Sequence, residues 1–217
     1  MNRPSPENPI PAGEQAPEAL EQKRFEARVR QAVNDAYAEV AQEQGEPNPK
    51  ELFWKPYCQQ FSQSLYARLA PLNAEPKYVR INKVPKDSPG NLRHHIFLAV
   101  KAPDGNDFFV DGTWQQLIDT PNEKTGLMFE RAQQALNSPA AKSAPKEVRE
   151  IWETGLCMLE AKRLVSTLSP AQKLKIKQAV TNELKIDERD YEHFINLVSN
   201  FRIEKAREIL EVIKKAR

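Results

Sequence analysis

Apolar residues recur at helical spacing in the N-terminal part of the chain, within a segment rich in Ala, Glu and Gln. The positions that set this spacing are Leu20, Phe25, Val29, Val33 and Tyr37. We expect one amphipathic helix over about residues 19–44, ended by Gly45 and Pro47. A second helix is predicted to run from about Pro56 to Pro71.

The pattern then changes to β-branched and aromatic residues, which are typical of strands. Three such stretches occur, at residues 77–84, 92–102 and 107–114. The turn-forming residues Pro103–Asn106 separate the last two stretches, so these two are predicted to form a hairpin.

Helical spacing resumes near residue 122 and continues toward the end of the chain, interrupted by a Ser-, Pro-, Ala- and Lys-rich linker near residues 137–145. Four helices are expected after the linker, over residues 146–168, 170–185, 188–199 and 202–216. The predicted fold class is therefore α+β, with helices and a short antiparallel sheet followed by an all-α C-terminal region.

This layout predicts three parts of the chain. Residues 1–16 contain four prolines and few large apolar residues, so we expect a disordered tail. Residues 17–144 are expected to form the core that carries any chemistry. Residues 145–217 are expected to form a helical accessory region outside the catalytic machinery, joined to the core by the linker.

The composition of the chain argues against several classes of protein. The 217 residues include 32 Lys and Arg and 30 Asp and Glu, a formal net charge of +2, which gives no support for nucleic-acid binding. No stretch is apolar enough to cross a membrane and no secretory signal is visible, so a cytoplasmic protein is expected. Cys58 and Cys157 lack the spacing of a zinc site, and with three histidines we expect neither a metal nor a cofactor.

Cys58 is the candidate nucleophile because of its place at the start of the second predicted helix. If Pro56 is near the first helical position, the free N–H groups and the positive end of the helix dipole stabilise a thiolate at Cys58. The same N–H groups can stabilise an oxyanion on a carbonyl that the sulfur attacks. The alternative interpretation is that Cys58 is a small buried apolar residue.

A nucleophilic thiol requires a base and a group that orients the base, and the hairpin can supply both. Residues 102–105 fit a type I turn with a left-handed Gly105, which closes a three-residue loop. That register places Asp111 on the same face of the sheet as His95, opposite or diagonal to it. A two-residue turn would place Asp111 on the His94 face, but about three or four residues away, too far for a hydrogen bond. We therefore predict His95 as the base, although a histidine on a strand is more often structural.

These segments resemble the active-site segments of transglutaminase-like cysteine enzymes. The sequences HIFLAV (residues 95–100) and FFVDGTW (residues 108–114) are similar to the His strand and the Asp-x-Thr strand of that superfamily. The segment from Cys58 to Leu69 resembles its nucleophile helix. The resemblance covers residues 54–114 and implies a papain-like α+β core with Cys58, His95 and Asp111 as a catalytic triad.

The sequence also departs from the family pattern. A Gln stands where the nucleophile helix often has Gly, and Phe97 stands where the family often has Trp. Arylamine N-acetyltransferases share the Cys-His-Asp order, but their Arg-Gly-Gly-rich segment before the cysteine is absent here. The resemblance implies an acyl-enzyme intermediate formed from a peptide or protein amide. It leaves open whether water or an amine resolves the intermediate, and thus whether the enzyme is a protease, a deamidase or a transglutaminase.

A second class of function is a catalytically inactive transglutaminase-like module that binds another protein through its C-terminal helices. The apolar residues that could form such a surface are Leu156, Leu159, Leu168, Ile195, Leu197, Ile209, Leu210 and Ile213. Such stripes more often form core within the chain. The reactivity of Cys58 separates the two classes, since a binding module does not require a reactive thiol. The oligomeric state is not indicated.

Overall fold

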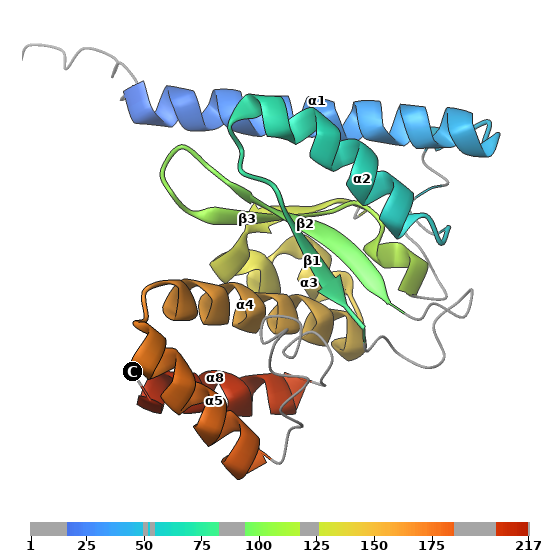
Figure 1. Ribbon diagram of the computed structural model, residues 1–217. Helices are drawn as coiled ribbons and strands as arrows, with labels where there is room; N and C mark the ends of the chain where they lie inside the picture. Colours follow the sequence, from blue (N-terminus) through green and yellow to red (C-terminus); the bar gives the residue numbers. More distant parts are fainter. Residues whose placement is uncertain are drawn as a thin grey trace, which may run out of the picture.

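A four-stranded antiparallel sheet lies between helical layers in the computed structural model, which describes residues 17–49, 52, 55–82, 94–117, 126–184 and 203–216. Helices α1 (Pro17–Gln44) and α2 (Cys58–Leu69) cover one face of the sheet. Helix α4 (Lys146–Ser166) covers the opposite face, and α5 (Pro170–Leu184) and α8 (Ile203–Ala216) lie beyond α4 (Figure 1). The predicted α+β class is therefore confirmed.

The strands follow the order β1-β2-β3-β4 across the sheet, each antiparallel to its neighbour. Their bounds are β1 (Lys77–Ile81), β2 (His95–Lys101), β3 (Asp107–Asp111) and β4 (Met128–Arg131). Nearly every residue of the inner strands β2 and β3 is buried, because helices cover both faces of the sheet. Strands of this kind read as continuous apolar runs and not as an alternating pattern.

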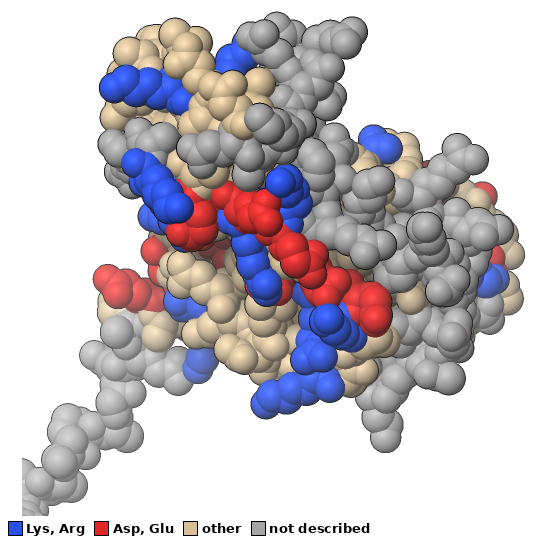
Figure 2. Space-filling model, turned by 90° about the horizontal axis from the view of Figure 1, so that it is seen from below, with Lys and Arg blue, Asp and Glu red and all other residues tan. Residues whose placement is uncertain are grey.

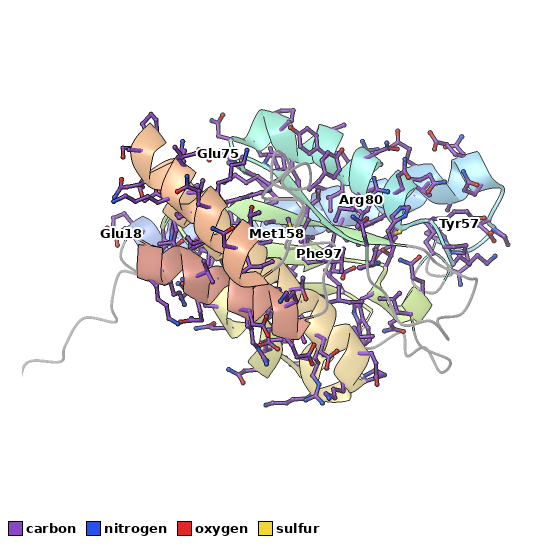
Figure 3. All side chains as sticks on the ribbon, turned by 60° about the horizontal axis from the view of Figure 1, so that its bottom comes forward. Glu18, Tyr57, Glu75, Arg80, Phe97 and Met158 are labelled. Carbon is purple, nitrogen blue, oxygen red and sulfur yellow. The ribbon has the colours of Figure 1, made fainter. Side chains whose placement is uncertain are left out.

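Alternate residues of the inner strands point into two separate cores. Phe97 and Phe109 pack toward α4, in the same cluster as Met158. Figure 3 shows Phe97 and Met158 where α4 crosses the sheet. Leu98 and Val110 pack toward α1 and α2. The face on which a strand residue projects therefore decides which helical layer it meets.

The β2–β3 hairpin has the three-residue loop that the sequence predicts. The Gly105 N–H donates to the Ala102 carbonyl at 2.9 Å, and the Ala102 N–H donates to the Asn106 carbonyl at 2.9 Å. Gly105 has a φ of 79°, the left-handed conformation that follows a type I turn in such loops. In the resulting register Leu98 pairs with Val110. The predicted register is confirmed.

Helix α8 is attached to α4 by an apolar face and by ion pairs. Its buried residues belong to the core on the α4 side of the sheet, and they are Ile203, Ala206, Ile209, Leu210, Val212 and Ile213. Arg207 pairs with Glu153, and Lys214 pairs with Glu160 at 3.3 Å. Figure 2, which views the molecule from below Figure 1, shows basic and acidic side chains interleaved on this face. Charge on this face is therefore mixed and not gathered by sign.

One predicted helix is a strand. The sequence predicts helix from about residue 122, whereas Met128–Arg131 forms β4 and pairs with β3. Short strands carry little periodicity, and β4 runs directly into a 3-10 helix (Ala132–Asn137), which continues the helical spacing.

The predicted exposed linker near residues 137–145 is also wrong. This segment contains the short helix α3 (Pro139–Ser143), whose first turn is capped by the Ser138 hydroxyl accepting the Ala141 N–H at 3.0 Å. Ala141 and Ala144 are buried against the sheet cluster. Small alanine side chains let the segment pack closely, while their weak hydrophobicity makes it look like a linker in the sequence.

Helix α4, which begins the predicted accessory region 145–217, packs directly on the sheet. Val148, Ile151 and Trp152 lie in the same buried cluster as the sheet residues. Helix α4 therefore forms the second cover of the sheet, and whether residues 145–217 are an accessory region stays a prediction. That residues 17–144 form a domain by themselves stays a prediction, and the predictions for residues 1–16 and for a helix over 188–199 concern parts of the chain outside the described ranges.

Candidate active site

The thiol of Cys58 lies at the beginning of α2, as the sequence predicts. Tyr57 precedes the helix, and its carbonyl accepts the Phe61 N–H at 2.9 Å. The Ser62 hydroxyl donates to the Ile96 carbonyl at 3.1 Å, which fixes the N-terminal part of the helix to β2. Figure 1 shows the start of α2, the start of β2 and the segment after β3 at the same end of the sheet.

His95 and Asp111 form a buried pair, as the hairpin register requires. Asp111 lies one step beyond the Leu98–Val110 pair, so it is opposite Phe97 and diagonal to His95 on one face of the sheet. The His95 Nε2 and the Asp111 Oδ2 are 2.8 Å apart, and both side chains are fully buried. The structure therefore brings together the two hairpin residues that the sequence selects.

Two further donors hold the Asp111 carboxylate. The Thr113 N–H donates to Oδ1 at 3.2 Å, and the Trp152 indole N–H donates to Oδ2 at 3.0 Å. Oδ2 thus accepts from Trp152 and contacts His95 at the same time. A buried carboxylate requires such partners, because an unpaired charge in the protein interior is strongly unfavourable.

The second ring nitrogen of His95 faces Gln116. The Gln116 Nε2 and the His95 Nδ1 are 2.8 Å apart, and Gln116 is 1 % exposed. When Nε2 of the neutral ring carries the proton toward Asp111, Nδ1 is left as an acceptor. In this tautomer Gln116 donates to Nδ1. In the imidazolium both ring nitrogens carry protons, and the Gln116 amide then turns so that its oxygen accepts from Nδ1.

The electrostatics of Cys58 and His95 favour the charged forms of both groups. Burial raises the pKa of the Cys58 thiol, but hydrogen bonding and the charge of His95, with hydrogen bonds from Gln116 and the Ile96 backbone, bring the pKa below its ordinary value. Burial lowers the pKa of His95, whereas the charge and hydrogen bond of Asp111 raise it to about 10. The two shifts together favour a thiolate at Cys58 beside an imidazolium at His95.

The other cysteine and the neighbouring histidine have different surroundings. Burial and the charge of Glu153 raise the pKa of Cys157 to about 11. His94 is partly exposed and precedes β2; burial and the charge of Arg80 lower its pKa. Neither residue belongs to the hydrogen-bonded cluster around Asp111, in agreement with the preference for His95 over His94.

Sequence reasoning missed Trp152 and Gln116. Trp152 lies on a helix 41 residues after Asp111, and no local pattern links the two residues. Gln116 lies in the 3-10 helix η4 (Trp114–Leu117) directly after the Asp-x-Thr segment, and its position between the apolar residues at the two ends of this helix is the signal that the sequence offers. Trp54, another aromatic near Cys58 in the sequence, is outside the described residues.

Two cavities, of about 560 and 700 Å³, lie around the β2–β3 loop. None of Cys58, His95 and Asp111 lines either of them. Within the described residues, no group of three or more His, Cys, Asp and Glu side chains is placed to hold a metal ion, and no helix is long and apolar enough to cross a membrane. No family model, curated protein sequence or solved structure matches this chain.

Proposed function

We propose that this protein is a thiol enzyme with a papain-like core of the transglutaminase-like superfamily, acting on amide or related acyl bonds. The observation that carries the proposal is the buried His95–Asp111 pair together with Cys58 at the start of α2, where His95 lowers the pKa of the thiol. A thiol, a base and a carboxylate that orients the base are the groups that nucleophilic attack on a carbonyl requires. The sequence resemblance of residues 54–114 supports the same conclusion.

In the proposed reaction, the Cys58 thiolate attacks the carbonyl carbon, a carbon–sulfur bond forms, and the carbonyl π electrons move to oxygen. Backbone N–H groups of the first turn of α2 have no partners within the helix and can stabilise that oxyanion. His95 gives its Nδ1 proton to the leaving nitrogen as the carbon–nitrogen bond breaks. Water or an amine, losing its proton to His95, then releases the acyl group from Cys58.

The surroundings of the thiol bear on how the enzyme meets its substrate. Cys58 is 3 % exposed, so a polypeptide reaches the sulfur only after neighbouring side chains move. Both cysteines are free thiols. A catalytic thiol must stay reduced, and we therefore propose a cytoplasmic location, where disulfides are rare.

The alternative function, binding through the C-terminal helices, receives less support. Several of the apolar positions that would form such a surface are buried within the chain, and they are Leu168, Ile209, Leu210 and Ile213. Ile195 and Leu197 lie outside the described residues. An apolar stripe that already packs inside the chain is not free to bind a partner.

Alkylation by iodoacetamide, followed by peptide mass mapping across pH 5 to 10, tests the proposal. We expect Cys58 to react much faster than Cys157 at pH 7, with a midpoint below that of an ordinary thiol, because only Cys58 has a lowered pKa. Exposure predicts the opposite order, since Cys157 is 7 % exposed and Cys58 is 3 % exposed. Fast labelling of Cys58 therefore reports thiolate chemistry and not access. Equal and slow labelling of both cysteines would contradict the proposal.

His95→Ala and His94→Ala form a matched pair for the same measurement. We expect His95→Ala to raise the alkylation midpoint of Cys58 and to abolish acyl transfer to Cys58 from p-nitrophenyl acetate, because the thiolate loses its imidazolium partner. His94→Ala should leave both properties close to those of the wild type. A larger effect of His94→Ala would mean that the wrong histidine has been assigned.

A further inference from the structure

Two buried tryptophans pack against each other behind the candidate triad. The rings of Trp114 and Trp152 are 5.4 Å apart and nearly perpendicular, and the two residues are 1 % and 0 % exposed. The Trp152 indole N–H donates to the Asp111 Oδ2. The Trp114 indole N–H is buried and has no hydrogen-bond partner among the described residues. The two residues thus share a core environment and differ in what their N–H groups contact.

We propose that Trp152 is a positioning residue of the triad. From α4, on the side of the sheet opposite to α2, it holds the Asp111 Oδ2 against the His95 Nε2. The role rests on the proposed function of Cys58, His95 and Asp111. A carboxylate that touches only one donor can rotate about its Cα–Cβ and Cβ–Cγ bonds. With Trp152 and His95 on one oxygen and the Thr113 N–H on the other, Asp111 has donors on three sides. Precise orientation of a catalytic group depends on such supporting contacts.

The structure of α4 allows this contact because Gly155 brings the helix close to the sheet. A Cβ atom at Gly155 would lie 2.9 Å from the Phe97 ring and 3.3 Å from the Phe109 ring. Gly155 is three residues after Trp152, so both lie on the face of α4 that meets the sheet. Phe97 is the residue opposite Asp111 across the β2–β3 pair. The absence of a side chain at Gly155 therefore lets the indole reach the carboxylate.

Trp152→Phe and Trp114→Phe are the matched variants, since each removes one indole N–H and a similar volume from the same core. We expect Trp152→Phe to raise the alkylation midpoint of Cys58 by about one pH unit, because a less firmly oriented Asp111 stabilises the His95 imidazolium less well. Trp114→Phe should leave the midpoint unchanged. Tyr37, the titratable group that α1 places near Asp111, stays neutral in this range, because burial and the Asp111 charge raise its pKa.

If Trp152→Phe does not fold, a second variant that replaces only the indole N–H allows the same measurement. β-(3-Benzothienyl)alanine at position 152 replaces the N–H by sulfur and preserves the shape of the ring. In addition, the indole N–H signal of Trp152 in a proton–nitrogen NMR spectrum should move in Asp111→Asn, while that of Trp114 should move less. Equal shifts of the two signals would overturn the role of Trp152.

The outcomes separate this role from the proposed function. A low midpoint for wild-type Cys58 that rises in His95→Ala and in Trp152→Phe, and not in Trp114→Phe, supports both proposals. A low wild-type midpoint that Trp152→Phe and the benzothienyl variant leave unchanged overturns the role of Trp152 alone. An ordinary midpoint for wild-type Cys58 overturns both proposals.

Discussion

The Asp111 carboxylate favours the protonated form of His95 in the protein interior. An unfolded chain offers no such partner, and a histidine there titrates near pH 6.5. In the folded protein, burial alone would lower the pKa of His95. The charge and the hydrogen bond of Asp111 outweigh burial and raise this pKa to about 10. Since the folded pKa is the higher one, this pair stabilises the fold fully below about pH 6.5. The contribution is lost as the pH rises through about 10.

Asp111→Asn is therefore expected to destabilise the protein by roughly 3–5 kcal/mol near pH 6, because it leaves a buried group without its charged partner. The difference from the wild type should shrink as the pH approaches 10, where His95 loses its proton in the wild type as well. Urea unfolding at pH 6, 8 and 10 measures the difference, and Asp107→Asn on the same strand is the control. A constant difference across the three pH values would show that the pair is not charged.

For single residues, the sequence predicts those positions that depend on nearby residues alone. Cys58 follows from a helix start, and the pairing of His95 with Asp111 follows from the parity of a strand and the length of one loop. The contacts of Trp152 and Gln116 do not follow from such rules. They depend on how a distant helix packs on the sheet and on the conformation of a 3-10 turn, and neither is encoded in spacing.

Helix α1 is connected to the Asp111 segment through one tyrosine. The Tyr37 hydroxyl donates to the Gly112 carbonyl at 2.5 Å, and its ring stacks on Phe61 of α2 at 4.5 Å. A Cβ atom at Gly112 would meet the Tyr37 hydroxyl and would lie 2.6 Å from the Phe61 ring. The residue after Asp111 is therefore enclosed by both helices of this layer.

Gly112→Ala is expected to destabilise the fold by about 1–3 kcal/mol, since the added methyl group overpacks a closed space. Tyr37→Phe should cost about 1–3 kcal/mol by leaving the Gly112 carbonyl unpaired. The double variant should lose less stability than the two single variants lose together, because removing the Tyr37 hydroxyl relieves part of the crowding at position 112. Thermal and urea unfolding of the four proteins measure this coupling. Wild-type stability for Gly112→Ala would refute the close approach.

The elements that the sequence mispredicts are short and poor in large apolar residues. Strand β4 has four residues, and its pattern merges with the helical spacing that follows. Helix α3 has five residues and depends on alanines for its packing. Longer elements such as α1, α4 and the β2–β3 hairpin carry enough repeats to be predicted within a few residues. Their mutual packing does not follow from periodicity, and the sequence does not indicate which of the C-terminal helices covers the sheet.

Across the whole molecule, the sheet has a buried face on each side, and the chain supplies the two covers from opposite ends. The N-terminal helices α1 and α2 cover one face, and α4, backed by α8, covers the other. A chain that ends at Ala144 would leave the second face open, including the rings of Phe97 and Phe109. An exposed apolar surface of this size favours association over a folded monomer.

We therefore expect a fragment of residues 1–144 to be insoluble or unfolded when expressed alone. Co-expression of residues 145–217 should restore a soluble complex with a reactive Cys58, because it returns the missing cover. Circular dichroism and iodoacetamide labelling measure the two properties. A soluble fragment 1–144 with a reactive Cys58 would instead establish the domain boundary that the sequence predicts.

The loop between β2 and β3 determines more than a change of direction. Because strand residues alternate between faces, inserting or deleting one residue in Pro103–Gly105 exchanges the faces of every residue in β3 relative to β2. Asp111 would then project toward α1 and α2 while His95 still projected toward α4. The number of residues in the loop therefore determines which face of the sheet each β3 side chain occupies. The residues of the loop can be substituted as long as position 105 keeps its left-handed conformation. A change of one residue in the length of the loop would separate the Asp111 carboxylate from the His95 imidazole.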